Sequence, residues 1–275
     1  MDHILPIRQA GEGPLPGAAV DSPSAIRESL SMDEGRFPDL WLSTPLGRCF
    51  LRSERRLVRQ ALEQRFGVDM VQIGAWGDPR GFLRGARTQR RTLLDWRPGR
   101  GQDVTSEPDA LALATDAADI MLLPHTFELV QSPHSLLREV DRVLRPDGHL
   151  LVLGFNGGSL WGLRQLLSVS GFPAGTRRVF REGRLRDWLE LLSFEIGSTK
   201  RYGGYLPISA ARLGVTDHNP LVRWLPPLAG GFLMSAQKRT QPLTPVRQRW
   251  RRPRLQVVGG LTEPTTRAGR INPSQ

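Results

Sequence analysis

A glycine-rich turn and a distant acidic side chain are the first features of this sequence that could bind a ligand. Gly74 and Gly77 follow a short apolar run, and Asp95 ends a second run about twenty residues later. A glycine turn lets the backbone approach a ligand closely, and a carboxylate at a strand end can accept hydrogen bonds from two ribose hydroxyls. The spacing fits both a dinucleotide and a nucleoside cofactor, and does not choose between them.

A histidine follows the third apolar run. Pro124, His125 and Thr126 come directly after the run at 118–123. An imidazole with a pKa near neutrality could act as a general base on a hydroxyl acceptor, although a lone histidine is more often structural. Cys49 is the only cysteine, so the sequence predicts neither an internal disulfide nor a metal site.

The elements that must position these residues alternate between strands and helices. The predicted strands are 70–73, 91–95, 118–123, 149–155, 194–202 and 231–238, and the predicted helices are 53–66, 132–144, 159–168 and 181–192, with a turn at 145–148. This alternation predicts an α/β fold with a doubly wound, mostly parallel sheet and helices on both faces. Because ligands bind beyond the carboxyl ends of such strands, we expect 74–77, Asp95 and 124–126 at one edge.

The flanking segments differ in composition from the predicted domain at 38–240. Residues 1–37 are rich in Gly, Pro and Ser and predict a disordered leader. The formal net charge is +11, and beyond residue 200 the chain has two acids against twelve Lys and Arg. The tail at 241–275 is therefore predicted to be basic and flexible, and its Trp250 could stack on a base while arginines bind phosphates.

The sequence carries no membrane or export signal. No stretch approaches the roughly 18 consecutive apolar residues that a membrane-spanning helix needs, and the start lacks the basic and apolar regions of a secretory signal. A single cysteine also agrees with a reducing compartment. We therefore expect a cytoplasmic protein.

The segment Leu136–Val152 resembles the helix, turn and fifth strand of class I S-adenosylmethionine-dependent methyltransferases of the type 11 family. Leu111–Leu123 is similar to the family's approach to its fourth strand, and Arg184–Ile196 to a later helix and strand. The resemblance covers most of residues 57–240. It implies a Rossmann-like methyltransferase fold, S-adenosylmethionine as cofactor and methyl transfer to an acceptor, most simply a small molecule.

The cofactor loop departs from the family's pattern. The family has an acid two residues before the first glycine of Gly-x-Gly-x-Gly, and here Gln72 replaces that acid. Gly74 is kept, Trp76 stands where the middle glycine would be, and Gly77 follows one position late. The resemblance implies that Gln72 and the loop would hold the methionine portion, with the Trp76 indole either filling the space or stacking along the cofactor.

Two further acids match cofactor-binding positions of the family. Asp95 corresponds to the ribose-binding acid at the end of the second strand, and Glu107 falls near the acid beside the adenine amino group. His125 lies where many methyltransferases place the acceptor. The segments 156–178 and 202–224 leave the same edge and could form the acceptor pocket.

Two other functions compete with a methyltransferase. The altered loop also fits a catalytically inactive methyltransferase-fold binding module, which could contact RNA through its Arg-rich tail. A nicotinamide-dependent oxidoreductase would require a complete Gly-x-Gly-x-x-Gly motif, and this chain lacks one.

Overall fold

The structure, a computed structural model, describes residues 39–167, 176, 178–204 and 229–239. The predictions on the leader at 1–37 and the tail at 241–275 lie outside the described residues, as does most of the long insert at 203–230. The described elements, in chain order, are α2 (Pro45–Glu63), β1 (Phe66–Ile73), η1 (Leu83–Gly85), β2 (Arg87–Asp95), β3 (Val104–Thr105), β4 (Ala118–Pro124), α3 (Thr126–Leu129), α4 (Pro133–Val143), β5 (Leu144–Phe155), α5 (Leu160–Leu167), α6 (Glu182–Leu191), β6 (Phe194–Tyr202) and β7 (Gly231–Lys238).

The strands form one mixed sheet of seven in the order β3-β2-β1-β4-β5-β7-β6. The first five of these pair in parallel, and β7 runs antiparallel to both β5 and β6. The predicted doubly wound, mostly parallel α/β fold is confirmed. Because the chain winds from β1 toward β3 on one side and from β4 toward β5 on the other, the strand order reverses between β1 and β4. Ligands bind at this place in open sheets of this kind.

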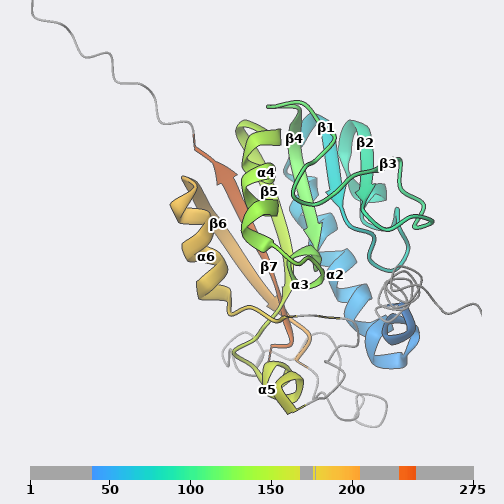
Figure 1. The fold of residues 1–275 in the computed structure, drawn as a ribbon. Helices are drawn as coiled ribbons and strands as arrows, with labels where there is room; N and C mark the ends of the chain where they lie inside the picture. Colours follow the sequence, from blue (N-terminus) through green and yellow to red (C-terminus); the bar gives the residue numbers. More distant parts are fainter. Residues whose placement is uncertain (1–38, 168–175, 177, 205–228, 240–275) are drawn as a thin grey trace, which may run out of the picture. The chain divides into compact units, whose positions relative to one another are not determined.

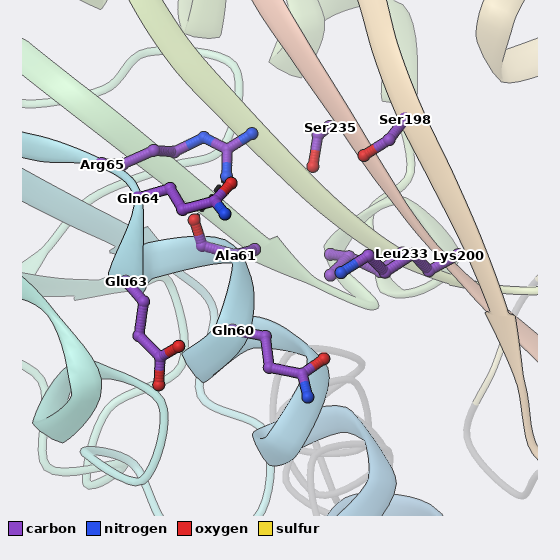
Figure 2. A pocket seen from close by; sticks show the side chains of 9 residues that line it. All are labelled: Gln60, Ala61, Glu63, Gln64, Arg65, Ser198, Lys200, Leu233 and Ser235. Atoms are coloured by element: carbon purple, nitrogen blue, oxygen red, sulfur yellow. Dashed lines mark hydrogen bonds between the residues drawn. The ribbon is translucent and has the colours of Figure 1, made fainter. Parts of the chain in front are cut away.

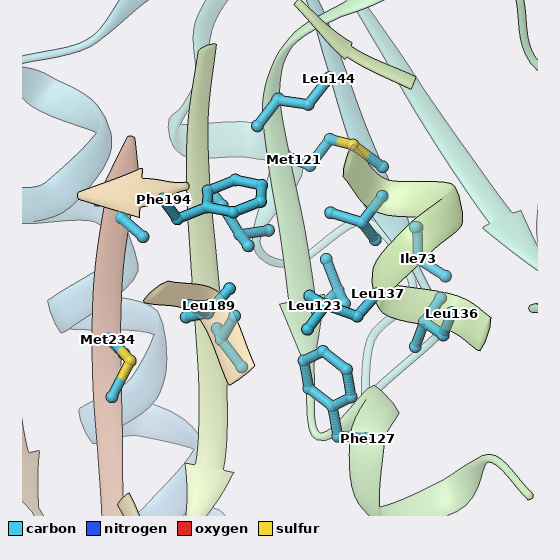
Figure 3. Close-up of a cluster of buried hydrophobic side chains, with 14 of the residues drawn as sticks. Ile73, Met121, Leu123, Phe127, Leu136, Leu137, Leu144, Leu189, Phe194 and Met234 are labelled. Atoms are coloured by element: carbon cyan, nitrogen blue, oxygen red, sulfur yellow. The ribbon is translucent and has the colours of Figure 1, made fainter. Parts of the chain in front are cut away.

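Helices cover both faces of the sheet (Figure 1). The helices α4 and α6 pack on one face, where Leu136, Leu137 and Leu189 contact strand residues such as Met121 and Leu123 (Figure 3). The helix α2 packs on the other face through Phe50, Val58 and Leu62. None of the described helices is both long and apolar enough to cross a membrane.

The connection between β1 and β2 lacks the crossover helix that such a unit usually has. Residues 74–86 contain only the single 3₁₀ turn η1. Four glycines and Pro79 lie in these thirteen residues, and both residue types disfavour a helix interior. No α-helix therefore begins between β1 and β2.

The leading helix differs from its prediction at both ends. It begins at Pro45, where Thr44 accepts a hydrogen bond from the Gly47 N–H, and it ends at Glu63 rather than at Phe66. Phe66, predicted on the buried face, opens β1 and is 68% exposed. Gly67 is needed for close approach rather than for ending the helix, since a Cβ there would lie 2.7 Å from the Asp119 Cβ. The apolar pattern of a helix does not show that the residues of its last predicted turn pair in a sheet instead.

Two details of the α4 and β5 unit also differ. Ser132 precedes α4 as predicted but makes no capping hydrogen bond with its side chain. The predicted turn at 145–148 lies within β5 as an irregularity, because Ala118 pairs with Leu144 while Ile120 pairs with His149. The remaining predicted strands and helices are confirmed to within a few residues at their ends.

Asp119 ties the start of β1 to β4 and gives a first testable prediction. Its Oδ2 accepts the backbone N–H groups of Val68 and Asp69 at 2.7 and 2.9 Å, and Oδ1 accepts from Arg145 Nη1 at 2.7 Å. Partial burial acts to raise the pKa of Asp119, but these hydrogen bonds outweigh it and lower the pKa. Asp119→Ala should reduce the free energy of unfolding by about 1–3 kcal/mol, because two backbone donors lose their partner. Urea unfolding beside the exposed control Asp109→Ala checks this, and equal midpoints for the two variants would contradict it.

Candidate cofactor and acceptor site

Three short contacts hold the predicted segments together at the carboxyl edge of the sheet. The Gly74 N–H donates to the Leu94 carbonyl at 2.8 Å, and the Ala75 N–H donates to Asp95 Oδ2 at 2.6 Å. Thr126 Oγ1 donates to the Ile73 carbonyl at 2.5 Å. The structure thus places the ends of β1, β2 and β4 side by side, as expected from their positions in the sequence.

The Asp95 carboxylate is buried and fully engaged within the chain. Oδ2 accepts from the Ala75 N–H and, at 2.9 Å, from Arg97 Nη2. Oδ1 accepts from the Arg97 N–H at 2.9 Å and from Arg97 Nε at 3.0 Å. Asp95 is 1% exposed, and the Arg97 side chain is 15% exposed. Sequence reasoning did not identify Arg97, since an arginine two residues after a strand-end acid carries no distinguishing signal.

The turn after β1 has the backbone conformation that its glycines predict. Gly74 has a φ of +89° and Gly77 a φ of +65°, values that L-residues with a side chain rarely adopt. Gln72 is completely buried, and its Nε2 donates to the Gly74 carbonyl at 2.9 Å. Its Oε1 is buried without a hydrogen-bond partner among the described residues. An unpartnered buried acceptor is costly, and it marks a place where a donor from a ligand would be favourable.

Trp96 lies against the glycine turn, a contact that the sequence did not predict. A Cβ on Gly74 would lie 3.5 Å from Trp96 Cζ3. The Arg97 guanidinium carbon lies 4.8 Å from the centre of the Trp96 ring. The indole therefore lies beside both the glycine turn and the arginine that is bonded to Asp95.

The Trp76 indole points into the core on the α2 face rather than remaining at the turn. Trp76 is fully buried, and its Nε1 donates to Glu54 Oε2 of α2 at 3.0 Å. Its ring centre lies 4.4 Å from that of His125. Of the two roles considered for Trp76, the arrangement supports filling the space. Glu54 is also fully buried, and the sequence signal that could have revealed it is an acid within the apolar stripe of Phe50, Val58 and Ala61.

His125 lies at the centre of a buried polar cluster that we name the Glu54 cluster, made of Glu54, Trp76, His125, Glu128 and Tyr202. His125 Nε2 is 2.7 Å from Glu54 Oε1, which also accepts from the Tyr202 hydroxyl at 2.9 Å. The Nδ1 atom lies 3.8 Å from Glu128 Oε1, close enough for attraction between charges but too far for a hydrogen bond.

The charges around His125 determine its protonation. Burial alone lowers the pKa of His125, but the carboxylates of Glu54 and Glu128 outweigh burial and raise this pKa to about 9. Burial and the Glu54 charge raise the pKa of Tyr202 well above its ordinary value. His125 is fully buried, and its raised pKa favours the protonated imidazole, which does not accept a further proton. Its φ of +54° shows that the surrounding structure holds it in an unfavourable backbone conformation.

Glu107 and a surface hollow lie apart from these residues. Glu107 is exposed in the loop after β3, where its backbone bridges to Ala110. A hollow of about 350 Å³ opens between the end of α2 and strands β6 and β7, next to the start of β1 (Figure 2). It is lined by Gln60, Ala61, Glu63, Gln64, Arg65, Ser198, Lys200, Leu233 and Ser235, none of which was predicted as a site residue.

The carboxyl edge brings together two of the residues predicted to hold S-adenosylmethionine, Asp95 and Gln72. Asp95 stands beside a glycine turn as a ribose-binding acid would, and Gln72 offers a free acceptor where the family places its acid. However, side chains of the chain itself fill both parts of such a site. The Arg97 side chain is bonded to the Asp95 carboxylate, and Trp76 with His125 fills the space behind the glycine turn.

Comparisons with known proteins concern the family of the whole chain rather than single residues of the edge. Residues 84–152 match the family model described as a methyltransferase domain. The chain is 31% identical over 233 residues to the uncharacterized protein YafS of Escherichia coli strain K12, a match that covers 82% of this chain and 92% of YafS.

Solved methyltransferase structures share the fold. A chain from the complex of the Haloferax volcanii Trm112 methyltransferase activator with a methyltransferase superposes with a TM-score of 0.52 at 14% identity, covering 74% of this chain and 98% of that one. Geranyl diphosphate C-methyltransferase from Streptomyces coelicolor gives 0.50 at 10% identity, covering 68% and 79%. The match to the methyltransferase family model and the relationship to YafS, on a fold that solved methyltransferases share, show that the chain belongs to the class I methyltransferases, whose cofactor is S-adenosylmethionine.

Proposed function

We propose that this protein transfers a methyl group from S-adenosylmethionine to a small-molecule acceptor. The observation that carries the proposal is the position of Asp95, a buried carboxylate at the end of β2 that is bonded to the N–H of the glycine turn. In a parallel sheet this is where the ribose of a nucleoside cofactor is held. The family membership of the chain supports the same reaction.

The chain would contribute binding and positioning rather than acid or base catalysis. When bound, S-adenosylmethionine supplies an electrophilic methyl group, so the reaction asks mainly for in-line placement of the acceptor and exclusion of water. Asp95 would hold the ribose hydroxyls. The Gln72 Oε1 atom would accept a hydrogen bond from the ammonium group, and Gly74, with its positive φ and no side chain, would let the backbone approach the methionine portion closely.

A small and partly apolar acceptor agrees best with the residues that follow β5. The helix α5 leaves the carboxyl edge and exposes Leu160, Leu163, Leu166 and Leu167, the last two at 84% and 77%. Trp161 of the same helix is buried against Phe50 and Phe155. Geranyl diphosphate C-methyltransferase, which shares the fold at 10% identity, is by its name a methyltransferase of geranyl diphosphate. An apolar surface beside the edge favours a ligand that gains from burial.

Calorimetric titration with S-adenosylmethionine and S-adenosylhomocysteine tests cofactor binding. We expect saturable binding by the wild-type protein and at least tenfold weaker binding by Asp95→Asn, since hydrogen bonds to a charged group contribute about 1.5–3 kcal/mol. The exposed Asp109→Asn variant is the matched control and should bind as the wild type does. If Asp95→Asn and Asp109→Asn bind equally well, Asp95 does not hold the ribose.

Transfer of a labelled methyl group tests the class of acceptor. The protein, with labelled S-adenosylmethionine, is incubated separately with the small-molecule and the macromolecular fractions of a cell extract. We expect label to enter the small-molecule fraction, and to enter it more in an organic than in an aqueous extract, with Asp95→Asn inactive. Label found only in protein or RNA would contradict the proposed acceptor.

The closed arrangement supports one competing function, a methyltransferase-fold module that binds a partner without catalysis. Its specific observation is that Asp95, Trp76 and His125 are each bonded to another side chain of the chain. Absence of saturable binding at millimolar S-adenosylmethionine and S-adenosylhomocysteine, in the wild type and in Arg97→Ala alike, would favour this module. Binding of RNA by the tail at 241–275 stays a prediction, tested by whether deleting the tail abolishes salt-sensitive retention on a polyanion.

A further inference from the structure

The Asp95 carboxylate has no hydrogen-bonding capacity left for a ligand. Two carboxylate oxygens offer about four lone-pair sites, and four donors already occupy them. One donor is the Ala75 N–H at 2.6 Å, and three belong to Arg97, at 2.9, 3.0 and 2.9 Å. The two hydroxyls of a ribose would have to donate to the same oxygens. A nucleoside and the Arg97 side chain therefore cannot both be bonded to Asp95 in this way.

Arg97 also joins the two elements that form the edge. Its Nη2 donates to the Ala75 carbonyl at 3.1 Å, so one guanidinium bridges the acid at the end of β2 and the turn after β1. The same guanidinium lies over the Trp96 ring. Bidentate pairs between arginine and a carboxylate are among the stronger charged hydrogen bonds, and limited exposure reduces their screening by water.

We propose that Arg97 determines the nucleoside affinity of this site by occupying, in the free protein, the carboxylate that the ribose of the cofactor needs. This inference rests on the proposed function, because it assumes that Asp95 holds the ribose. Arg97 is then a residue that sets affinity by competition rather than a catalytic residue. In the closed state, the Arg97 guanidinium is bonded to the Asp95 carboxylate. A nucleoside binds only after the guanidinium has left the carboxylate.

The competition reduces the apparent affinity. When only a fraction of molecules is competent to bind, the apparent dissociation constant rises by the inverse of that fraction. Removal of the guanidinium should thus make binding tighter, whereas removal of a residue that contacts the cofactor makes it weaker. The sign of the effect separates the proposed role of Arg97 from an ordinary binding contact.

Calorimetric titration of Arg97→Ala with S-adenosylhomocysteine tests the proposal. We expect the dissociation constant to fall by tenfold or more relative to the wild type, with Arg97→Lys between the two because an ammonium cannot pair in the same bidentate way. Arg91→Ala, which removes an exposed arginine of β2, controls for the change in net charge and should leave the affinity unchanged. Thermal unfolding verifies that each variant is folded, and Arg97→Lys carries the test if Arg97→Ala is not.

A pair of nucleosides tests whether the gain in affinity depends on the ribose hydroxyls. Adenosine should bind Arg97→Ala more tightly than the wild type, whereas 2′,3′-dideoxyadenosine, which lacks both hydroxyls, should gain nothing. Equal or weaker binding of S-adenosylhomocysteine by Arg97→Ala, beside a wild type that binds it, would overturn the role of Arg97 and leave the proposed function standing. Binding by Arg97→Ala but not by the wild type would support both. If no variant binds either ligand, the proposed function fails and the role of Arg97 fails with it.

Discussion

Glu54→Ala is expected to lower the free energy of unfolding by about 3–5 kcal/mol, because it leaves a buried cation without its partner. Glu54 Oε1 lies 2.7 Å from His125 Nε2 and accepts from Tyr202, while Oε2 accepts from Trp76. All four side chains are buried, so water cannot replace the lost acceptor. Urea unfolding followed by far-ultraviolet circular dichroism measures the effect.

Two further variants separate the charge of Glu54 from its shape and position. Glu54→Gln keeps the size and one acceptor oxygen, so it should lose less stability than Glu54→Ala. Glu63→Ala changes an exposed acid of the same helix and should stay within about 0.5 kcal/mol of the wild type. A loss for Glu54→Ala no greater than that for Glu63→Ala would show that the Glu54 cluster contributes no net stability.

The stability of the fold is expected to fall as the pH rises from 6.5 through about 9. The pKa of His125 is raised from 6.5 to about 9 in the folded protein, because the two carboxylates outweigh the effect of burial. A raised pKa means that the folded state binds the proton more tightly than the unfolded state does. The contribution of protonated His125 to the free energy of unfolding is therefore present in full below pH 6.5, and it is lost as the imidazole deprotonates near pH 9. This contribution is about 3 kcal/mol, since each pKa unit corresponds to about 1.4 kcal/mol.

His125→Asn is the variant that tests this pH dependence. Asparagine tolerates the positive φ at this position better than most residues, and it carries no titrating group. Its unfolding free energy should change much less between pH 6.5 and 9 than that of the wild type. The other perturbed groups act outside this interval, because burial lowers the pKa of His149 and raises that of Tyr202 above its ordinary value. If the unfolding free energies of the two proteins changed in parallel with pH, this would contradict the assignment of the pH dependence to His125.

The Glu54 cluster also connects α2 with the edge. It links α2 to the residues that follow β1 and β4, through Trp76 and His125 respectively. Methyl transfer needs a rigidly positioned acceptor more than it needs a proton acceptor. A charged, enclosed histidine therefore fits a role in holding the edge together, and the acceptor would be placed by other residues.

Most of the fold could be predicted from the sequence because its elements are locally encoded. The strands β6 and β7 follow their predicted bounds, and the amphipathic pattern of α4 gives its buried face, with Leu136, Leu137 and Val140. The near-continuous apolar run at 149–155 indicated a strand covered on both faces, as observed. The end of α2 could not be predicted, because Phe66 fits a helical stripe locally but pairs with Arg87 in the sheet.

The sequence by itself determined which residues meet at the edge, since the carboxyl ends of neighbouring parallel strands must lie together. It placed Gly74, Asp95 and His125 there and gave the glycine turn its positive φ. Only the tertiary structure decided what those side chains do. Whether a carboxylate faces a ligand or an arginine depends on atoms that approach from other elements, and Glu54 reaches His125 across 71 positions of the sequence. Hydrogen-bond partners of this kind leave no periodic signal in the chain.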